Sequence, residues 1–144
     1  MPTDRFSHSF VVDALPSRVY AHLIEPQSYV GLSPLVVTVR EVEQVADAVR
    51  YVAVERFGFG PFRWDNNIRV EMRGTPDVRV VSDVSSPGRV RLVATVDLRP
   101  ARHGTQVTEI IELTAPILLR GFANGQARKV QQERAAELTR RMRA

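Results

Sequence analysis

Two polar residues, Glu55 and Asn66, lie at positions where the surrounding sequence predicts apolar side chains. Residues 48–58 and 62–73 each alternate apolar and polar side chains with a period of two, which is typical of a half-buried antiparallel strand. Both residues fall on the apolar phase. If a tight loop at Gly60-Pro61 joins the strands, residue numbers that sum to 121 pair across it, and Glu55 faces Asn66. Such a pair inside an apolar pocket could orient a ligand hydroxyl or carbonyl, or supply acid–base chemistry.

The same register gives an internal check on this pairing. It places Phe57 opposite Trp64 and Tyr51 opposite Val70, which are inward positions when the phase of each strand is chosen by itself. Two alternatives stay open: the pair is only a satisfied structural contact, or a slip of one residue turns Glu55 to the outside.

The sequence contains no motif for metal binding, dinucleotide binding or a nucleophilic serine. The three histidines are widely spaced, with no H-x-x-x-H pair, and there is no cysteine, so we expect no metal site. Gly58-Phe59-Gly60 is followed by proline and a strand, whereas a dinucleotide-binding fingerprint opens a helix. No serine stands in a nucleophile-elbow pattern. We therefore expect no cofactor.

Turn residues divide the chain into the elements that would position these side chains. Clusters rich in glycine, proline and other turn formers interrupt the pattern, and the segments between them are typical of a meander of strands. The predicted strands lie near residues 5–13, 35–45, 48–58, 62–73, 77–85, 88–99 and 105–114. The predicted helices lie at 17–24, at 26–31, and from Pro116 toward Ala144.

Alternation also predicts which strand residues face inward. Only the strand at 35–45 is ambiguous, because both of its faces carry valines and charges. The predicted inward set is Phe6, His8, Phe10, Val12, Tyr51, Ala53, Glu55, Phe57, Phe62, Trp64, Asn66, Ile68, Val70, Met72, Val78, Val80, Ser82, Val84, Val90, Leu92, Ala94, Val96, Val107, Glu109, Ile111 and Leu113.

The last helix has an apolar stripe and a basic face. The stripe consists of Leu119, Phe122, Val130, Leu138 and Met142, and the other face carries Arg128, Lys129, Arg134, Arg140, Arg141 and Arg143. Gly121 and Gly125 weaken the first turns by about 1 kcal/mol each relative to alanine, which a kink, a close approach to a ligand or simple tolerance would explain. We expect a ligand to contact Tyr51, Glu55, Phe57, Trp64, Asn66, Ile68, Ser82, Leu92, Ala94, Ile111, Leu119 and Phe122.

Length and composition limit the classes of protein. The 144 residues fit one domain spanning 1–144. No apolar run resembles a signal peptide or spans a bilayer, so we expect a cytoplasmic protein without membrane insertion. The net charge is +4, but the outward arginines of the predicted sheet alternate with acidic residues, and most aromatic residues point inward. We therefore expect no nucleic-acid partner.

Three features resemble a known family: the opening from Phe10 to Tyr20 with Ala14 and Pro16, Ser33-Pro34 entering the second strand, and the arginine-rich last helix. Over essentially the whole chain the sequence resembles the START/Bet v 1-like (SRPBCC) helix-grip superfamily, in particular its small bacterial polyketide cyclase/dehydrase-like branch. The resemblance implies an α+β fold in which a seven-stranded curved antiparallel sheet wraps around a long C-terminal helix, with two short helices after the first strand. It also implies a cavity for lipids, sterols or polyketides, and a minority of such proteins are enzymes.

The topology implied by the resemblance makes the strands of His8 and Glu109 neighbours. A carboxylate that orients an imidazole can support general acid–base catalysis. The alternative is an exposed salt bridge or two solvated residues, because edge strands are often exposed.

Three functions follow as hypotheses. The first is binding of a hydrophobic or amphipathic small molecule in an internal cavity. The second is a metal-free polyketide cyclase, aromatase or dehydratase, with Glu55, His8 and Glu109 as catalytic candidates. The third is an interaction protein that docks an acidic partner through the arginine-rich C-terminal helix, which neutralising Arg140 and Arg141 would test. The identity of the ligand, the oligomeric state and the pathway stay open at this point.

Overall fold

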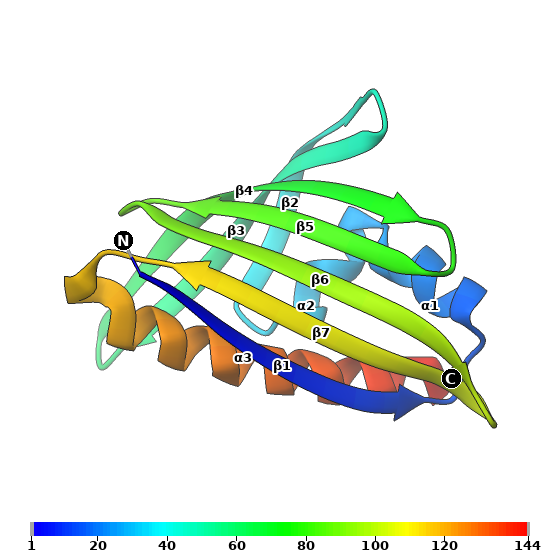
Figure 1. Ribbon diagram of the computed structural model, residues 1–144. Coiled ribbons are helices and arrows are strands. Elements are labelled where there is room, and N and C mark those ends of the chain that lie inside the picture. The colour runs from blue at the N-terminus through cyan, green and yellow to red at the C-terminus, as the bar shows by residue number, and fades with distance from the viewer. Residues whose placement is uncertain (1, 144) are drawn as a thin grey trace.

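Seven antiparallel strands form one curved sheet that grips a long C-terminal helix on its concave side (Figure 1). The computed structural model describes residues 2–143. The strand order is β1-β7-β6-β5-β4-β3-β2, and the predicted fold class is confirmed. The elements are β1 (Thr3–Val12), α1 (Pro16–Leu23), the 3₁₀ helix η1 (Pro26–Ser28), α2 (Tyr29–Leu32), β2 (Val36–Val45), β3 (Ala48–Phe59), β4 (Phe62–Thr75), β5 (Arg79–Ser86), β6 (Val90–Ala101), β7 (Gly104–Thr114) and α3 (Ile117–Arg143).

The β3–β4 hairpin has the register predicted from its loop. Gly60 has φ +58°, and Pro61 follows with its fixed negative φ, which is the pattern of a type II′ turn. Phe59 therefore pairs with Phe62, and Glu55 pairs with Asn66. Because a slip by one residue would turn every side chain to the other face, this turn decides which residues face α3.

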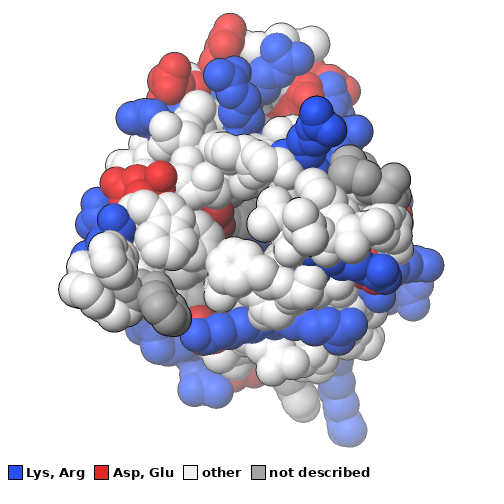
Figure 2. All heavy atoms as spheres, turned by 90° about the vertical axis from the view of Figure 1, so that its left-hand side faces the viewer, with Lys and Arg blue, Asp and Glu red and all other residues white. Residues whose placement is uncertain are grey.

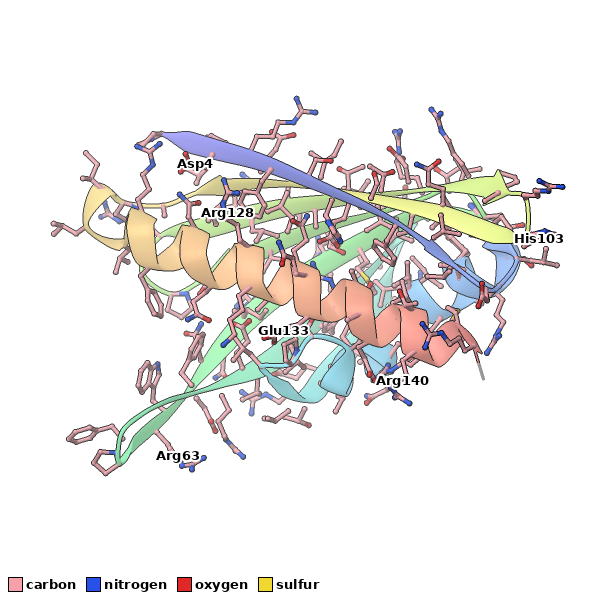
Figure 3. All side chains as sticks on the ribbon, turned by 90° about the horizontal axis from the view of Figure 1, so that it is seen from below. Asp4, Arg63, His103, Arg128, Glu133 and Arg140 are labelled. Carbon is pink, nitrogen blue, oxygen red and sulfur yellow. The ribbon has the colours of Figure 1, made fainter. Side chains whose placement is uncertain are left out.

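The predictions for Phe62 and Val78 were wrong. Phe62 is 68% exposed, because it follows the turn at the tip of a hairpin that extends beyond the rest of the sheet (Figure 3). Alternation continues there, but within residues 2–143 no helix or strand covers the Phe62 side chain. Val78 is 52% exposed because β5 begins only at Arg79, and Val78 belongs to a turn in which its backbone N–H donates to Thr75.

Strand β2 explains why its inward phase could not be assigned. Its register against β3 shifts twice, between Val36 and Thr38 and between Arg40 and Glu43. Val36 and Val39 are therefore both buried, although they are three residues apart and regular alternation would put them on opposite faces.

Packing is dense at one end of the molecule and sparse at the other. The C-terminal half of α3 buries Leu138 and Met142 in a cluster shared with Val19 and Leu23 of α1. The N-terminal half presents the short side chains Ala123 and Ala127 to a smaller cluster on the sheet. Small side chains on this half of α3 leave space between the helix and the sheet.

None of the helices within residues 2–143 combines the length and the apolar character that crossing a bilayer requires.

Candidate functional site

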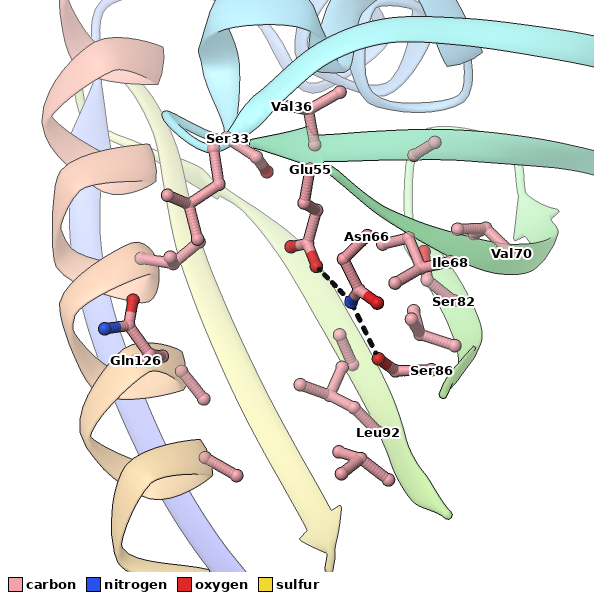
Figure 4. A pocket seen from close by; sticks show the side chains of 18 of the residues that line it. Ser33, Val36, Glu55, Asn66, Ile68, Val70, Ser82, Ser86, Leu92 and Gln126 are labelled. Atoms are coloured by element: carbon pink, nitrogen blue, oxygen red, sulfur yellow. Dashed lines mark hydrogen bonds between the residues drawn. The ribbon is translucent and has the colours of Figure 1, made fainter. Parts of the chain in front are cut away.

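A cavity of about 370 Å³ lies between the concave face of the sheet and the N-terminal half of α3 (Figure 4). The residues predicted to contact a ligand all line it, namely Tyr51, Glu55, Phe57, Trp64, Asn66, Ile68, Ser82, Leu92, Ala94, Ile111, Leu119 and Phe122. The structure thus brings the whole predicted set around one space, and their contact with a ligand stays a prediction.

Three polar side chains form a hydrogen-bonded row on the sheet wall of this cavity. Asn66 of β4 donates through Nδ2 to Glu55 Oε1 at 3.5 Å and to Ser86 Oγ at 3.0 Å (Figure 4). The first contact follows from the predicted β3–β4 pairing. Ser86 was not predicted, because it ends β5 and its contact with Asn66 depends on the pairing of β4 with β5. We call Glu55, Asn66 and Ser86 the polar row.

The environment of Glu55 favours its neutral form. Burial raises the pKa of its carboxyl group, while the hydrogen bond from Asn66 and the positive charge of Arg134 oppose that shift. Desolvation prevails because neighbours such as Ala53 and Ile68 offer no compensating charge. In its neutral form the carboxyl group can both donate and accept a hydrogen bond, so in that form the polar row can meet a ligand oxygen of either kind.

A second polar cluster lies along α3 and was missed by the sequence analysis. Arg134 donates through Nη2 to Glu109 Oε1 at 2.5 Å and through Nη1 to Ser33 Oγ at 3.1 Å. Its side chain is only 18% exposed, so its assignment to the basic outer face was wrong. Residues 122, 126, 130 and 134 follow one another at helical spacing and all line the cavity. That spacing was a usable signal, and the charge of Arg134 concealed it.

The pairing of His8 with Glu109 across β1 and β7 is confirmed, but the carboxylate has another partner. Arg134 holds Glu109, and the Gln131 amide donates to the backbone oxygen of Glu109 at 3.2 Å. His8 stacks on Phe10 with ring centroids 5.7 Å apart, and it is not among the cavity-lining residues. The two side chains therefore do not form the expected dyad in this structure.

The cavity opens at one end between the β3–β4 hairpin and the start of α3. Phe57 stacks on Trp64 with centroids 5.6 Å apart and lies 6.3 Å from Phe122. Figure 2 shows a hollow at this end surrounded by uncharged side chains, with charged groups farther out. We call this opening the mouth.

The part of the chain that the structure describes contains no group of three or more histidine, cysteine, aspartate or glutamate side chains that could hold a metal ion.

Comparison with known proteins establishes the fold. No family model and no curated protein sequence matches the chain, but many solved structures do. The aromatase/cyclase Zhui from Streptomyces sp. R1128 superposes with a TM-score of 0.80 at 13% identity, over 99% of this chain and 98% of that one. The di-domain ARO/CYC BexL from the BE-7585A biosynthetic pathway gives 0.79 at 13% identity over 99% of this chain, which spans only 50% of the length of BexL. Ara h 8.0201 gives 0.68 at 8% identity, over 95% and 98% of the two chains. The protein has the helix-grip, Bet v 1-like fold that the sequence resemblance implied.

Proposed function

We propose that this protein binds a hydrophobic or amphipathic small molecule, such as a lipid, sterol or polyketide-like compound, in the cavity beneath α3. One observation carries the proposal: an apolar cavity of about 370 Å³ contains a hydrogen-bonded polar row on one wall. Ligand pockets typically measure about 300–1,000 Å³ and combine apolar walls with a few placed polar groups. The apolar walls would exclude water from the body of the ligand, and the polar row would fix its orientation.

Filling the cavity tests the proposal. Ala94 lines the cavity from β6 and is 8% exposed, so Ala94→Phe would place a phenyl ring in the ligand space. Val11→Phe is the matched control, because Val11 is 55% exposed and lies outside the lining. Native mass spectrometry of freshly purified protein would detect a retained ligand. Titration with fatty acids, sterols and aromatic polyketides, followed by Trp64 fluorescence, would measure affinity. We expect binding in the wild type and in Val11→Phe, and loss in Ala94→Phe. Absence of binding to every class would refute the proposal.

A second candidate function is a cyclase or dehydratase acting on a polyketide-like substrate. The observation that favours it is Glu55, a carboxyl group whose pKa is raised by burial, since a general acid must hold its proton near the working pH. The names of Zhui and BexL give the reaction class to test. If Glu55 transfers a proton, Glu55→Gln abolishes turnover while binding persists. Unchanged turnover in that variant would exclude Glu55 as the acid.

The hypothesis of an acidic partner docked by the last helix finds less support. Arg140 and Arg141 both bind Glu137, and Arg141 also donates to the backbone oxygens of Ser28 and Val30. The contacts of Arg141 fasten the end of α3 onto η1 and α2, which is a structural role, whereas among residues 2–143 Arg140 pairs only within α3.

A further inference from the structure

Large apolar side chains are exposed around the mouth of the cavity. Leu118 is 96% exposed, Ile117 78% and Phe122 57% at the start of α3, and Phe62 is 68% and Trp64 48% exposed on the β3–β4 hairpin. Trp64 and Phe122 line the cavity, whereas Phe62, Ile117 and Leu118 do not. The last three side chains are therefore not explained by ligand contact or by packing in the fold.

These side chains lie on two projections that flank an opening. The hairpin tip, marked by Arg63 in Figure 3, extends away from the body of the molecule, and α3 begins at the same end (Figure 1). A patch of exposed apolar side chains in a protein of this size indicates an interaction surface. Two projections on either side of an opening can both insert into a lipid bilayer, because a bilayer deforms around them. They match the flat or concave surface of a folded protein partner less well.

Arginines outnumber acidic residues on the segments around the mouth. The three segments at the mouth, residues 56–64, 86–91 and 116–122, contain five arginines and no acidic residue. Three of the arginines pair with acidic residues that lie outside these segments: Arg56 with Asp65, Arg91 with Asp83 and Arg120 with Asp4.

Two arginines at the mouth keep their charge uncompensated. Arg63 and Arg89 form no ion pair with any residue between 2 and 143. Arg63 neighbours Phe62 and Trp64 in the sequence. Arg89 follows Gly88, whose position is in contact range of Leu119 at the start of α3. Each of these charges therefore lies next to exposed apolar side chains.

We infer that the mouth docks on an anionic lipid bilayer, with Phe62, Leu118 and their apolar neighbours in the interface and with Arg63 and Arg89 on the head groups. Apolar and aromatic side chains combined with arginine are the chemistry of proteins that adsorb to membrane surfaces. Docking of this kind buries side chains only to the level of the head groups and needs no membrane-spanning helix. In this orientation the cavity faces the bilayer, so an apolar ligand could enter or leave without crossing water.

Sedimentation with lipid vesicles tests this inference independently of the cavity. The probes are vesicles of phosphatidylglycerol and phosphatidylcholine in equal parts, and vesicles of phosphatidylcholine alone, both at about 0.1 M salt. We expect the wild type to sediment with the anionic vesicles and much less with the neutral ones. Leu118→Ser should weaken binding at least about tenfold through lost apolar burial. Arg63→Gln and Arg89→Gln should each weaken it about fivefold.

Matched controls lie at the opposite end of the molecule. Leu15 is 70% exposed at the start of α1, and Arg102 is exposed in the β6–β7 turn beside His103. Leu15→Ser and Arg102→Gln should sediment like the wild type. Leu118→Ser should also keep its ligand affinity without vesicles, because Leu118 lies outside the cavity lining.

Four results would overturn the inference: no sedimentation of the wild type, equal sedimentation with neutral vesicles, wild-type behaviour of Leu118→Ser, or equal losses in the control variants. If the wild type is a dimer that does not bind vesicles, and Leu118→Ser is a monomer, the surface serves self-association instead. None of these outcomes affects the proposed binding in the cavity, which is measured in solution.

Discussion

Replacing Glu55 by leucine would remove both hydrogen-bonding functions from one end of the polar row. Asn66 Nδ2 lies 3.5 Å from Glu55 Oε1, at the limit of a hydrogen bond, but only 3.0 Å from Ser86 Oγ. Ser86 therefore keeps Asn66 in place in Glu55→Leu, and we expect the fold to persist. A ligand oxygen that met Glu55 would lose its partner, which costs about 1–3 kcal/mol, or about 5- to 150-fold in Kd.

Glu55→Gln separates the hydrogen bonds of this residue from its charge. Glutamine offers one donor group and one acceptor, as the neutral carboxyl group does. If the neutral form of Glu55, which burial stabilises, is the form that meets the ligand, Glu55→Gln should bind nearly as well as the wild type.

The same series predicts a change in the pH dependence of stability. The folded protein keeps the Glu55 proton above the ordinary carboxyl pKa of 4.5, so in that window it binds more protons than the unfolded chain. The free energy of unfolding therefore falls as the pH rises through the window, by at most about 1.4 kcal/mol per pH unit. Neither variant has this proton, so both should gain stability relative to the wild type as the pH rises above 4.5.

Two measurements decide the matter: Trp64 fluorescence titration for affinity, and thermal unfolding across that pH range for stability. If Glu55→Leu binds as tightly as the wild type, Glu55 does not anchor the ligand. If Glu55→Gln loses as much affinity as Glu55→Leu, the ionised form of Glu55 is the binding form. Parallel stability curves for all three proteins would likewise contradict a desolvated Glu55.

Four further predictions concern stability and partners. Arg134→Met leaves the Glu109 carboxylate buried without its partner and should lower the free energy of unfolding by about 3 kcal/mol. Urea denaturation measures this change. An unchanged denaturation midpoint would show that water reaches Arg134 and Glu109. Gly121→Ala should raise stability by up to about 1 kcal/mol, because an added Cβ meets no described atom within 4 Å. Gly74→Ala should lower it by about 1–3 kcal/mol, because that Cβ would lie 2.0 Å from the Tyr20 hydroxyl; equal effects of the two glycine changes would contradict this packing. We also expect no nucleic-acid binding at about 0.15 M salt, since several outer-face arginines pair with acidic residues, and fluorescence anisotropy with labelled DNA and RNA checks this.

Local rules were enough to predict the sheet and much of the cavity wall. Alternation over 62–73 fixes the inward phase of β4, and the short Gly60-Pro61 loop fixes its register against β3. Both signals act over a few residues, and they agree. Glu55 and Asn66 could therefore be placed together from the sequence.

Signals of the same kind fail where an element ends or bends. Phe62 continues the alternation of β4 but lies beyond the concave face, and the two register shifts in β2 interrupt its period. A strand residue on the inward phase is buried only if another helix or strand extends far enough to cover it. The alternation within one strand carries no information about the length of the other elements.

Only the tertiary structure decided what the charged residues of α3 do. Helical spacing puts Arg134 on the same stripe as Phe122 and Val130, but an arginine there could equally lie in solvent. Its burial depends on Glu109, 25 positions earlier in the chain, and on Ser33, 101 positions earlier, because a buried charge is tolerated only where a partner compensates its lost hydration. Whether such a partner is present depends on the rotation of α3 over the sheet, and packing of the assembled fold sets that rotation.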